Sequence, residues 1–260
     1  MNTEQSGQRL VIRRRVGPLE FVAASPGAAV DYVIETVLQG VGRHVHLANA
    51  YTVALADKSA DYRAILSDPA IIFPDGKPIA WVSAMSRQSP RLEQVRGPQL
   101  FLDVFEEGVT QNIQHYLLGS TPAVLETLRA KLIRRFPSAR IVGAESPPFR
   151  VLTVDEIDAQ DERIRASGAQ LVWVGLGTPK QDFEAERLSV ALPVTAVAIG
   201  AAFDFAAGTL REAPSWMRFL GLEWVFRLLS EPRRLWKRYL FGNARFLKSA
   251  LLVPTRSYDK

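Results

Sequence analysis

The sequence predicts an α/β protein with a Rossmann-like, mostly parallel sheet, helices on both faces and a basic, amphipathic helical appendage at the C-terminus. Short apolar runs alternate with helical patterns along most of the chain, which is typical of a parallel sheet. Most of these runs are almost continuously apolar, as strands covered on both faces must be. The length of 260 residues and a hydrophobic content of 47% suit one large domain, or one domain with an appendage.

Six candidate strands carry the apolar runs, and seven candidate helices separate or precede them. The strands are expected at 43–48, 70–73, 114–118, 139–142, 170–174 and 194–199. The helices are expected at 26–39, 51–66, 76–87, 98–109, 121–136, 153–167 and 179–190. Ligands of such folds bind beyond the carboxyl ends of the strands. The residues that directly follow each strand are therefore the candidate site.

Three strands are followed by turns rich in glycine and in helix-starting residues. These turns lie at 119–122 (GSTP), 175–181 (GLGTPKQ) and 200–208 (GAAFDFAAG). Glycine lets a ligand approach the backbone, and free N–H groups at a helix start attract phosphate. An ordinary strand-to-helix turn explains any one of them. Three in one sheet indicate a nucleotide or sugar-phosphate pocket, although neither GxGxxG nor a P-loop lysine is present.

A carboxylate stands at the end of a fourth apolar run, in the stretch IIFPDGKPIAW. Asp75 lies one residue past the candidate strand 70–73, after Pro74, and the chain then begins a helix at Gly76. A simple Pro-Asp-Gly turn would need no chemistry, but an acid at this edge of the sheet faces the ligand side. Asn49 follows strand 43–48 in an equivalent place, where it can bind a sugar or phosphate or cap the next helix.

Several classes of chemistry lack their residues. The chain has no cysteine, and no cluster has metal-ligand spacing. His44, His46 and His115 lie in candidate strands, where core or surface positions explain them. There is no Asp-x-Asp to hold a divalent ion against a diphosphate, so we expect neither metal nor cofactor, and helix N-termini and arginines must neutralise the diphosphate. No signal peptide and no apolar run of about 18 residues is evident.

The positive charge is concentrated near the C-terminus. Residues 211–260 carry 11 Lys/Arg and 4 acids, whereas 1–210 carry 21 and 23. From Pro232 onward, leucines and aromatic residues recur at helical spacing with Lys/Arg between them, which favours a helix lying on an anionic membrane surface. A helix packed on the sheet with a solvated basic face is the alternative. Nucleic acid is less favoured, because no recognised motif or stacking platform is present.

Six segments together resemble the WecG/TagA/CpsF glycosyltransferase family over about residues 15–247. They are LANAYTVALA, IIFPDGKPIAW, LLGSTPAVLETL, VWVGLGTPKQDFEAERL, AIGAAFDFAAGTLREAPSWM and GLEWVFRLLSEPRRLWKRYL. The resemblance implies an inverting, metal-independent bacterial enzyme. Such an enzyme moves a sugar from a UDP-sugar to a sugar on a polyprenyl diphosphate, in the assembly of exopolysaccharide, capsule or another cell-surface glycan.

The resemblance also implies roles for individual residues. The family's general base corresponds to Asp75. The residues expected to bind the donor or substrate are Asn49, Gly119, Ser120, Gly177, Lys180, Gln181, Phe203 and Asp204. The arginines expected at the acceptor diphosphate or the membrane are Arg227, Arg233, Arg234 and Arg238.

The chain departs from the family pattern at a few positions. Leu47 replaces a common threonine, Gln94 and Gln99 replace a usual arginine and aspartate, and Glu212 is inserted in the usual Arg-Ala-Pro. Arg91 or Arg96 is a candidate substitute for the arginine lost at position 94.

We therefore expect a hexosyltransferase with a catalytic domain at 1–210 and a membrane-associating helical appendage at 211–260. It would sit peripherally on the cytoplasmic face of the inner membrane. The expected partners are a UDP-sugar, a polyprenyl-diphosphate-linked sugar and an anionic membrane, with a homo-oligomer possible and no nucleic acid. The alternatives are a non-catalytic subunit that binds nucleotide sugar and, less favoured, a nucleic-acid-binding protein. The sequence names neither sugar nor pathway.

Overall fold

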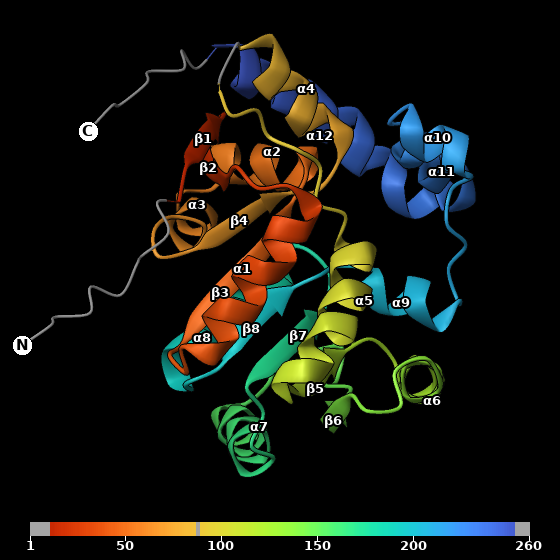
Figure 1. The fold of residues 1–260 in the computed structure, drawn as a ribbon. Coiled ribbons are helices and arrows are strands. Elements are labelled where there is room, and N and C mark those ends of the chain that lie inside the picture. The colour runs from red at the N-terminus through yellow and green to blue at the C-terminus, as the bar shows by residue number, and fades with distance from the viewer. Residues whose placement is uncertain (1–10, 87–88, 253–260) are drawn as a thin grey trace, which may run out of the picture.

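The protein is built on a six-stranded sheet in which every neighbouring pair of strands is parallel (Figure 1). The structure, a computed structural model, describes residues 11–86 and 89–252. The strands lie in the order β4-β3-β8-β7-β5-β6. They are β3 (Arg43–Ala48), β4 (Ile71–Pro74), β5 (Gln114–Gly119), β6 (Arg140–Glu145), β7 (Leu171–Gly175) and β8 (Thr195–Ala198). All six predicted strands are confirmed, and so is the α/β fold.

The central strands are apolar on both sides because each side faces a separate core. Leu171 and Trp173 of β7 pack into a core with α1 (Pro26–Leu38), α5 (Gly97–Glu107) and α6 (Pro122–Arg135). Val172 and Val174 point the other way, into a core with α7 (Val154–Ala166) and α8 (Lys180–Ala191). Successive side chains of a strand alternate between faces, so a doubly covered strand reads as a continuous apolar run.

The predicted helix 51–66 is two helices, and this part of the prediction is wrong. Helix α2 (Ala50–Lys58) ends and α3 (Ala60–Ile65) begins at Ser59, whose backbone is extended. The Ser59 hydroxyl accepts a hydrogen bond from the Tyr62 N–H (3.2 Å) and so caps the second helix. The helix predicted at 76–87 is α4 (Lys77–Met85).

Several elements fall outside the predicted set. An antiparallel hairpin, β1 (Arg13–Val16) and β2 (Leu19–Val22), turns at Gly17, which has a positive φ of 59°. A short 3-10 helix, η1 (Gly108–Gln111), follows α5. Helices α9 (Ala202–Ala207), α10 (Ser215–Phe219) and α11 (Glu223–Ser230) follow the last strand.

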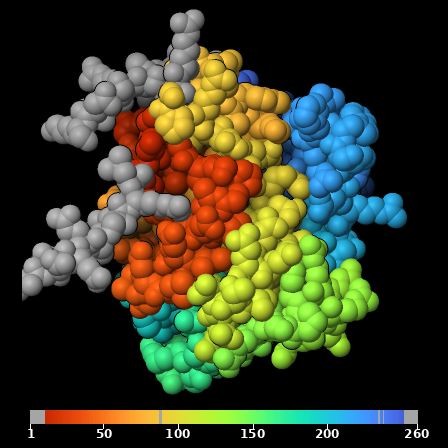
Figure 2. All heavy atoms as spheres, viewed as in Figure 1, coloured from red at the N-terminus to blue at the C-terminus, as the bar shows by residue number. Residues whose placement is uncertain are grey.

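The last helix, α12 (Pro232–Leu252), packs on α2. Leu235, Gly242, Phe246 and Ser249 are buried on one face of it, and Phe246 joins a core that includes residues of the β1–β2 hairpin. Leu240 and Leu247 are exposed. The predicted helix therefore carries one apolar stripe against the protein and a second apolar stripe toward solvent. Figure 2 shows the light-blue atoms of α10 and α11 beside the golden and yellow atoms of α4 and α5.

Candidate active site

Asp75 lies where the sequence places it, immediately past the end of β4. Its backbone N–H donates to the Ala48 carbonyl oxygen (2.8 Å), which holds the residue against the end of the neighbouring strand β3. The chain then turns at Gly76, whose φ of 117° favours glycine. A Cβ atom built on Gly76 would lie 3.9 Å from Cβ of Asn49. The two polar residues predicted at adjacent strand ends are thus neighbours.

The surroundings of Asp75 make its carboxylate a stronger base than usual. Burial, followed by the negative charge of Glu223, raises the pKa of Asp75 from its ordinary 3.8 to about 6. Arg96, Arg227 and a hydrogen bond from the Gly97 N–H act in the opposite direction and are outweighed. A base with a pKa near 6 is mostly ionised at neutral pH and still binds a proton well, which suits general-base chemistry.

Two arginines of the C-terminal segment bring unpaired hydrogen-bond donors to this carboxylate. The Nε atoms of Arg227 and Arg238 are buried and have no hydrogen-bond partner among the described residues. The Arg227 guanidinium lies 5.8 Å from the ring centre of Phe205, and that of Arg238 lies 4.4 Å from the ring centre of Tyr51. A buried charged donor without an acceptor costs about 1–3 kcal/mol or more, so this part of the site is suited to an anion.

Of the two candidate replacements for the missing arginine, only Arg96 lies beside Asp75. Its Nη2 atom donates to Glu212 and to Glu223, both at 3.2 Å, and thereby ties α5 to the C-terminal segment. Arg91 is exposed. The role of Glu223 was missed by sequence reasoning, because 127 residues separate it from Arg96. The acid at the start of the GLEWV segment was the only signal of it.

The other two predicted arginines are Arg233 and Arg234. Arg233 is exposed in the first turn of α12. The side chain of Arg234 lies outside the described residues. Among the described side chains, Arg227 and Arg238 are the predicted C-terminal arginines that lie near Asp75.

The glycine-rich turns are shaped as predicted, but several of their backbone donors are already used. Gly119 has a φ of 129°, and a Cβ built there would lie 2.5 Å from the Gly175 oxygen. The Ser120 N–H donates to that same oxygen (3.1 Å). The Gly177 and Gly200 N–H groups both donate to Oε1 of Gln181, at 3.0 and 3.1 Å. These donors are satisfied within the protein, which gives the arginines a larger share in holding an anion.

The remaining predicted binding residues have varied settings. Gln181 is buried and ties the turns after β7 and β8 together. Phe203 is fully buried beneath Gly175, where a Cβ would lie 2.7 Å from its ring. Asp204 is partly buried and accepts a 3.4 Å hydrogen bond from the Thr209 hydroxyl, while Lys180 is exposed at the start of α8.

Asn49 is an N-cap, the alternative that its position allowed. Its Oδ1 atom accepts from the N–H groups of Tyr51 (3.0 Å) and Thr52 (3.4 Å), and the Asn49 N–H donates to the Thr52 hydroxyl (3.3 Å). This reciprocal capping box fixes the start of α2. The side-chain nitrogen of Asn49, Nδ2, is then the atom suited to donate to a ligand.

A buried chain of hydrogen bonds joins β3 and α3 to Asp182 of α8, the residue next to Gln181. Asp182 accepts from the Tyr62 hydroxyl (2.7 Å) and lies 2.9 Å from His46 Nδ1, and the other ring nitrogen of His46 shares a hydrogen bond with His44 Nδ1 (2.9 Å). Thr52 bonds the Tyr62 hydroxyl. Burial lowers the pKa of His44 to about 3, so its ring stays neutral. These histidines are core residues, as the sequence indicated.

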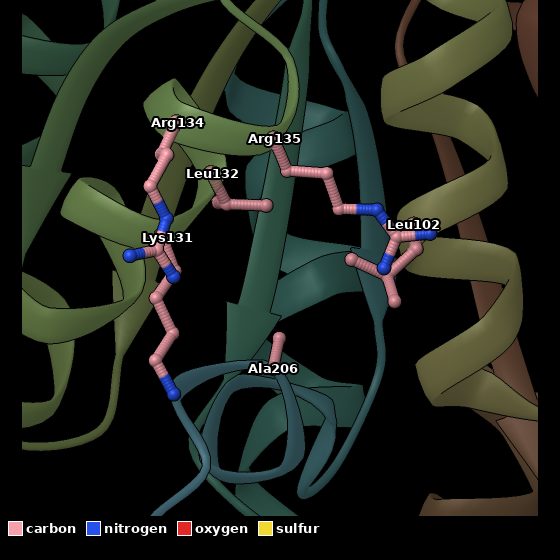
Figure 3. A pocket seen from close by; sticks show the side chains of 6 residues that line it. All are labelled: Leu102, Lys131, Leu132, Arg134, Arg135 and Ala206. Atoms are coloured by element: carbon pink, nitrogen blue, oxygen red, sulfur yellow. The ribbon is translucent and has the colours of Figure 1, made fainter.

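A separate pocket lies away from this carboxylate, between α5, α6 and α9 (Figure 3). None of the predicted site residues lines it; the lining residues are Leu102, Lys131, Leu132, Arg134, Arg135 and Ala206. It holds no acid for proton transfer. Within the described part of the chain, no group of three or more His, Asp or Glu residues could hold a metal ion, and no helix is long and apolar enough to cross a membrane.

At the rim of the parallel sheet, a carboxylate of raised pKa thus lies near two arginines whose buried Nε atoms have no partner in the described part of the chain. Such a combination suits a transferase that activates a hydroxyl beside a diphosphate. Comparison with known proteins agrees with this class. The model of the glycosyl transferase WecG/TagA/CpsF family matches residues 14–259. The chain belongs to the WecG/TagA/CpsF family and is a glycosyltransferase.

One relative is an N-acetylglucosaminyldiphosphoundecaprenol N-acetyl-beta-D-mannosaminyltransferase from Bacillus spizizenii. It is 29% identical to this chain over 227 residues, which cover 86% of each protein. The resemblance seen in the sequence motifs is thereby confirmed.

Proposed function

We propose that this enzyme moves a sugar from a UDP-sugar to a saccharide on a polyprenyl diphosphate, with inversion and without a metal ion. The relative acts on a diphosphoundecaprenol-linked sugar, which supports an acceptor of the same chemical class. The observation that carries the proposal is the position of Asp75 beside the unpaired donors of Arg227 and Arg238.

The reaction is a single displacement at the anomeric carbon of the donor. Asp75 accepts the proton of the acceptor hydroxyl while that oxygen bonds to the anomeric carbon. The bond from this carbon to the diphosphate oxygen breaks, and UDP leaves with the electron pair. One displacement on an α-linked donor gives a β product, which is the configuration in the relative's name.

Negative charge grows on the diphosphate as the bond breaks, and positive groups must stabilise it. Arg227 and Arg238 serve this purpose, because their buried Nε–H groups lack acceptors in the described part of the protein. The turns at Gly119–Ser120 and Gly177 place the backbone close to the donor. Asn49 and Asp204 orient its sugar or nucleotide, together with Lys180 at the start of α8, while Gln181 and Phe203 hold the turns in shape.

The basic appendage brings this site to its lipid-linked substrate at an anionic membrane surface. We place the enzyme peripherally on the cytoplasmic face of the inner membrane, where UDP-sugars are available. The charge of residues 211–260, with 11 basic and 4 acidic groups, supports this placement. Self-association through exposed apolar residues is the competing use of the same surface.

A panel of UDP-sugars tested with several lipid-diphosphate-linked saccharides, N-acetylglucosamine among them, decides the proposal. One donor should be turned over, its anomeric configuration should invert, and Asp75→Asn should lower turnover by about 10²–10⁴. Asp31→Asn on the exposed side of α1 is the control and should act as wild type. Binding of UDP-sugar without transfer to any acceptor would instead identify a non-catalytic assembly subunit.

A further inference from the structure

Helix α4 begins two residues after Asp75, and Figure 1 shows it at the same end of the molecule as α2 and α12. Ile79, Val82 and Ser83 are buried on its inner side. Trp81 and Met85 are 47% and 66% exposed. Residues four apart share one face of a helix, so α4 turns a large aromatic and a large aliphatic side chain outward together.

This outward face continues onto helix α10. Gly221 follows α10 with a φ of 70°, and a Cβ built there would lie 2.7 Å from the Trp81 ring and 2.9 Å from Cβ of Lys77. Phe219 and Leu220, the two residues before Gly221, are 80% and 52% exposed. We call Trp81, Met85, Phe219 and Leu220 the α4–α10 lip. An apolar surface of this kind on a folded protein marks a contact with another phase or partner.

The charge around the lip selects the kind of partner. The C-terminal segment that contains α10 is strongly basic, and Lys77 stands at the lip itself. Arg218 of α10 is also close, although it already pairs with Glu212 (2.6 Å). An anionic bilayer supplies both an apolar phase for the ring and methylene groups and phosphate groups for the cations. Indole rings are also favoured at the level of the headgroups.

We propose that the α4–α10 lip enters the headgroup layer of an anionic bilayer and sets the height of Asp75 above it. The inference rests on the proposed function and adds α4, which belongs to the catalytic part of the chain, to the membrane contact. Along a helix each residue rises about 1.5 Å, so Trp81 and Met85 stand about 6 and 12 Å along the axis from Lys77. A carboxylate near the base of this helix can reach a sugar that is joined to a membrane-anchored diphosphate.

Vesicle binding tests the lip without any transfer reaction. Binding to vesicles of phosphatidylglycerol and phosphatidylcholine is measured by cosedimentation. Met85→Glu and Phe219→Glu should each lower the vesicle-binding constant by at least about tenfold, because each variant loses apolar contact and adds a negative charge that the anionic lipid repels. Val190→Glu is the matched control, since Val190 on α8 is 79% exposed and outside the lip. Circular dichroism verifies that all three variants are folded.

Turnover of Met85→Glu shows whether the lip acts in membrane binding or in the reaction itself. Turnover of a water-soluble, short-chain acceptor should stay at the wild-type level in Met85→Glu, whereas turnover of the same acceptor on a long polyprenyl chain in vesicles should fall. Vesicle binding equal to wild type in both lip variants overturns the proposal. So does a change confined to the oligomeric state in light scattering, which would make the lip a contact between copies. Loss of vesicle binding in a protein that transfers no sugar would support the lip and refute the proposed function.

Discussion

Replacing Asp75 by asparagine should make the protein more stable while it removes turnover. The folded protein raises the pKa of this carboxyl from 3.8 to about 6, mainly by burial and then by Glu223. A carboxyl whose pKa is higher in the folded state binds its proton more tightly there than in the unfolded chain. Its contribution to stability is therefore close to zero well below pH 3.8, becomes a cost as the pH rises from about 4 to about 6, and stays constant above that. Asparagine has a similar shape and never carries the charge.

The size of the effect follows from the pKa difference. A rise of about 2 pKa units corresponds to about 3 kcal/mol of unfolding free energy at pH 7, where the group is ionised in both states. At pH 5 the folded carboxyl is mostly protonated, and the cost falls to less than about 2 kcal/mol. For a chain of this size, about 3 kcal/mol raises the melting temperature by roughly 5–10 °C.

Urea unfolding of wild type and Asp75→Asn at pH 5 and pH 7, followed by circular dichroism, measures both values. The variant should be more stable at each pH, and its advantage should be larger at pH 7. Asp31→Asn, an exposed carboxylate-to-amide change on α1, should show no comparable advantage. A variant that is no more stable than wild type at pH 7, or an advantage that does not shrink at pH 5, would refute the account of the Asp75 environment.

Three further predictions concern the same site and its support. Glu223→Gln removes a negative charge that raises the pKa of Asp75, so the acidic limb of the pH profile of kcat/KM should move to lower pH; an unmoved limb would contradict this assignment. Tyr62→Phe leaves the buried Asp182 with one donor fewer and should lower the unfolding free energy by about 1–3 kcal/mol in urea melts, whereas wild-type stability would show that the bond contributes nothing. Transfer should be unchanged by excess EDTA, and loss of transfer that Mg²⁺ or Mn²⁺ restores would rule out the metal-free mechanism.

The sheet could be predicted because both of its faces are buried. Runs such as Leu171–Val174 stay apolar throughout, and a run of that kind between turn residues has few alternatives. The hairpin was missed for the opposite reason. Arg13, Arg14 and Arg15 look like a solvated basic segment, yet in the fold Arg15 pairs with Glu20 of the facing strand, and Arg13 donates to the Ala70 oxygen. These partners come next to the arginines only once the hairpin has formed and packed, so the local sequence does not reveal them.

The same limit applies inside the site. Asp75 was predictable, because a parallel sheet brings the residues after its strands to one edge. The partners of Asp75 reach it from the far end of the chain: Arg227 was expected near a diphosphate or the membrane only through the family resemblance, and Glu223 was not expected. The buried Gln181 shows a further limit: its sequence context indicated a ligand, and its side-chain oxygen bonds two backbone N–H groups. A sequence pattern predicts that a buried amide must find donors, but it does not say which ones.

The C-terminal segment and the Asp75 carboxylate depend on each other in this fold. The sheet supplies Asp75, but Glu223 and Arg227, which shift its proton affinity in opposite directions, belong to α11. That helix is joined to α5 through the Glu223–Arg96 contact, and α12 closes over α2 with Arg238 on the face of Tyr51. The C-terminal segment therefore both shifts the pKa of Asp75 and places Arg227 and Arg238 near it, where the proposed reaction needs cations for the leaving group. A site assembled in this way is complete only when the basic segment, which we expect at the membrane, is packed against α2 and the start of α5.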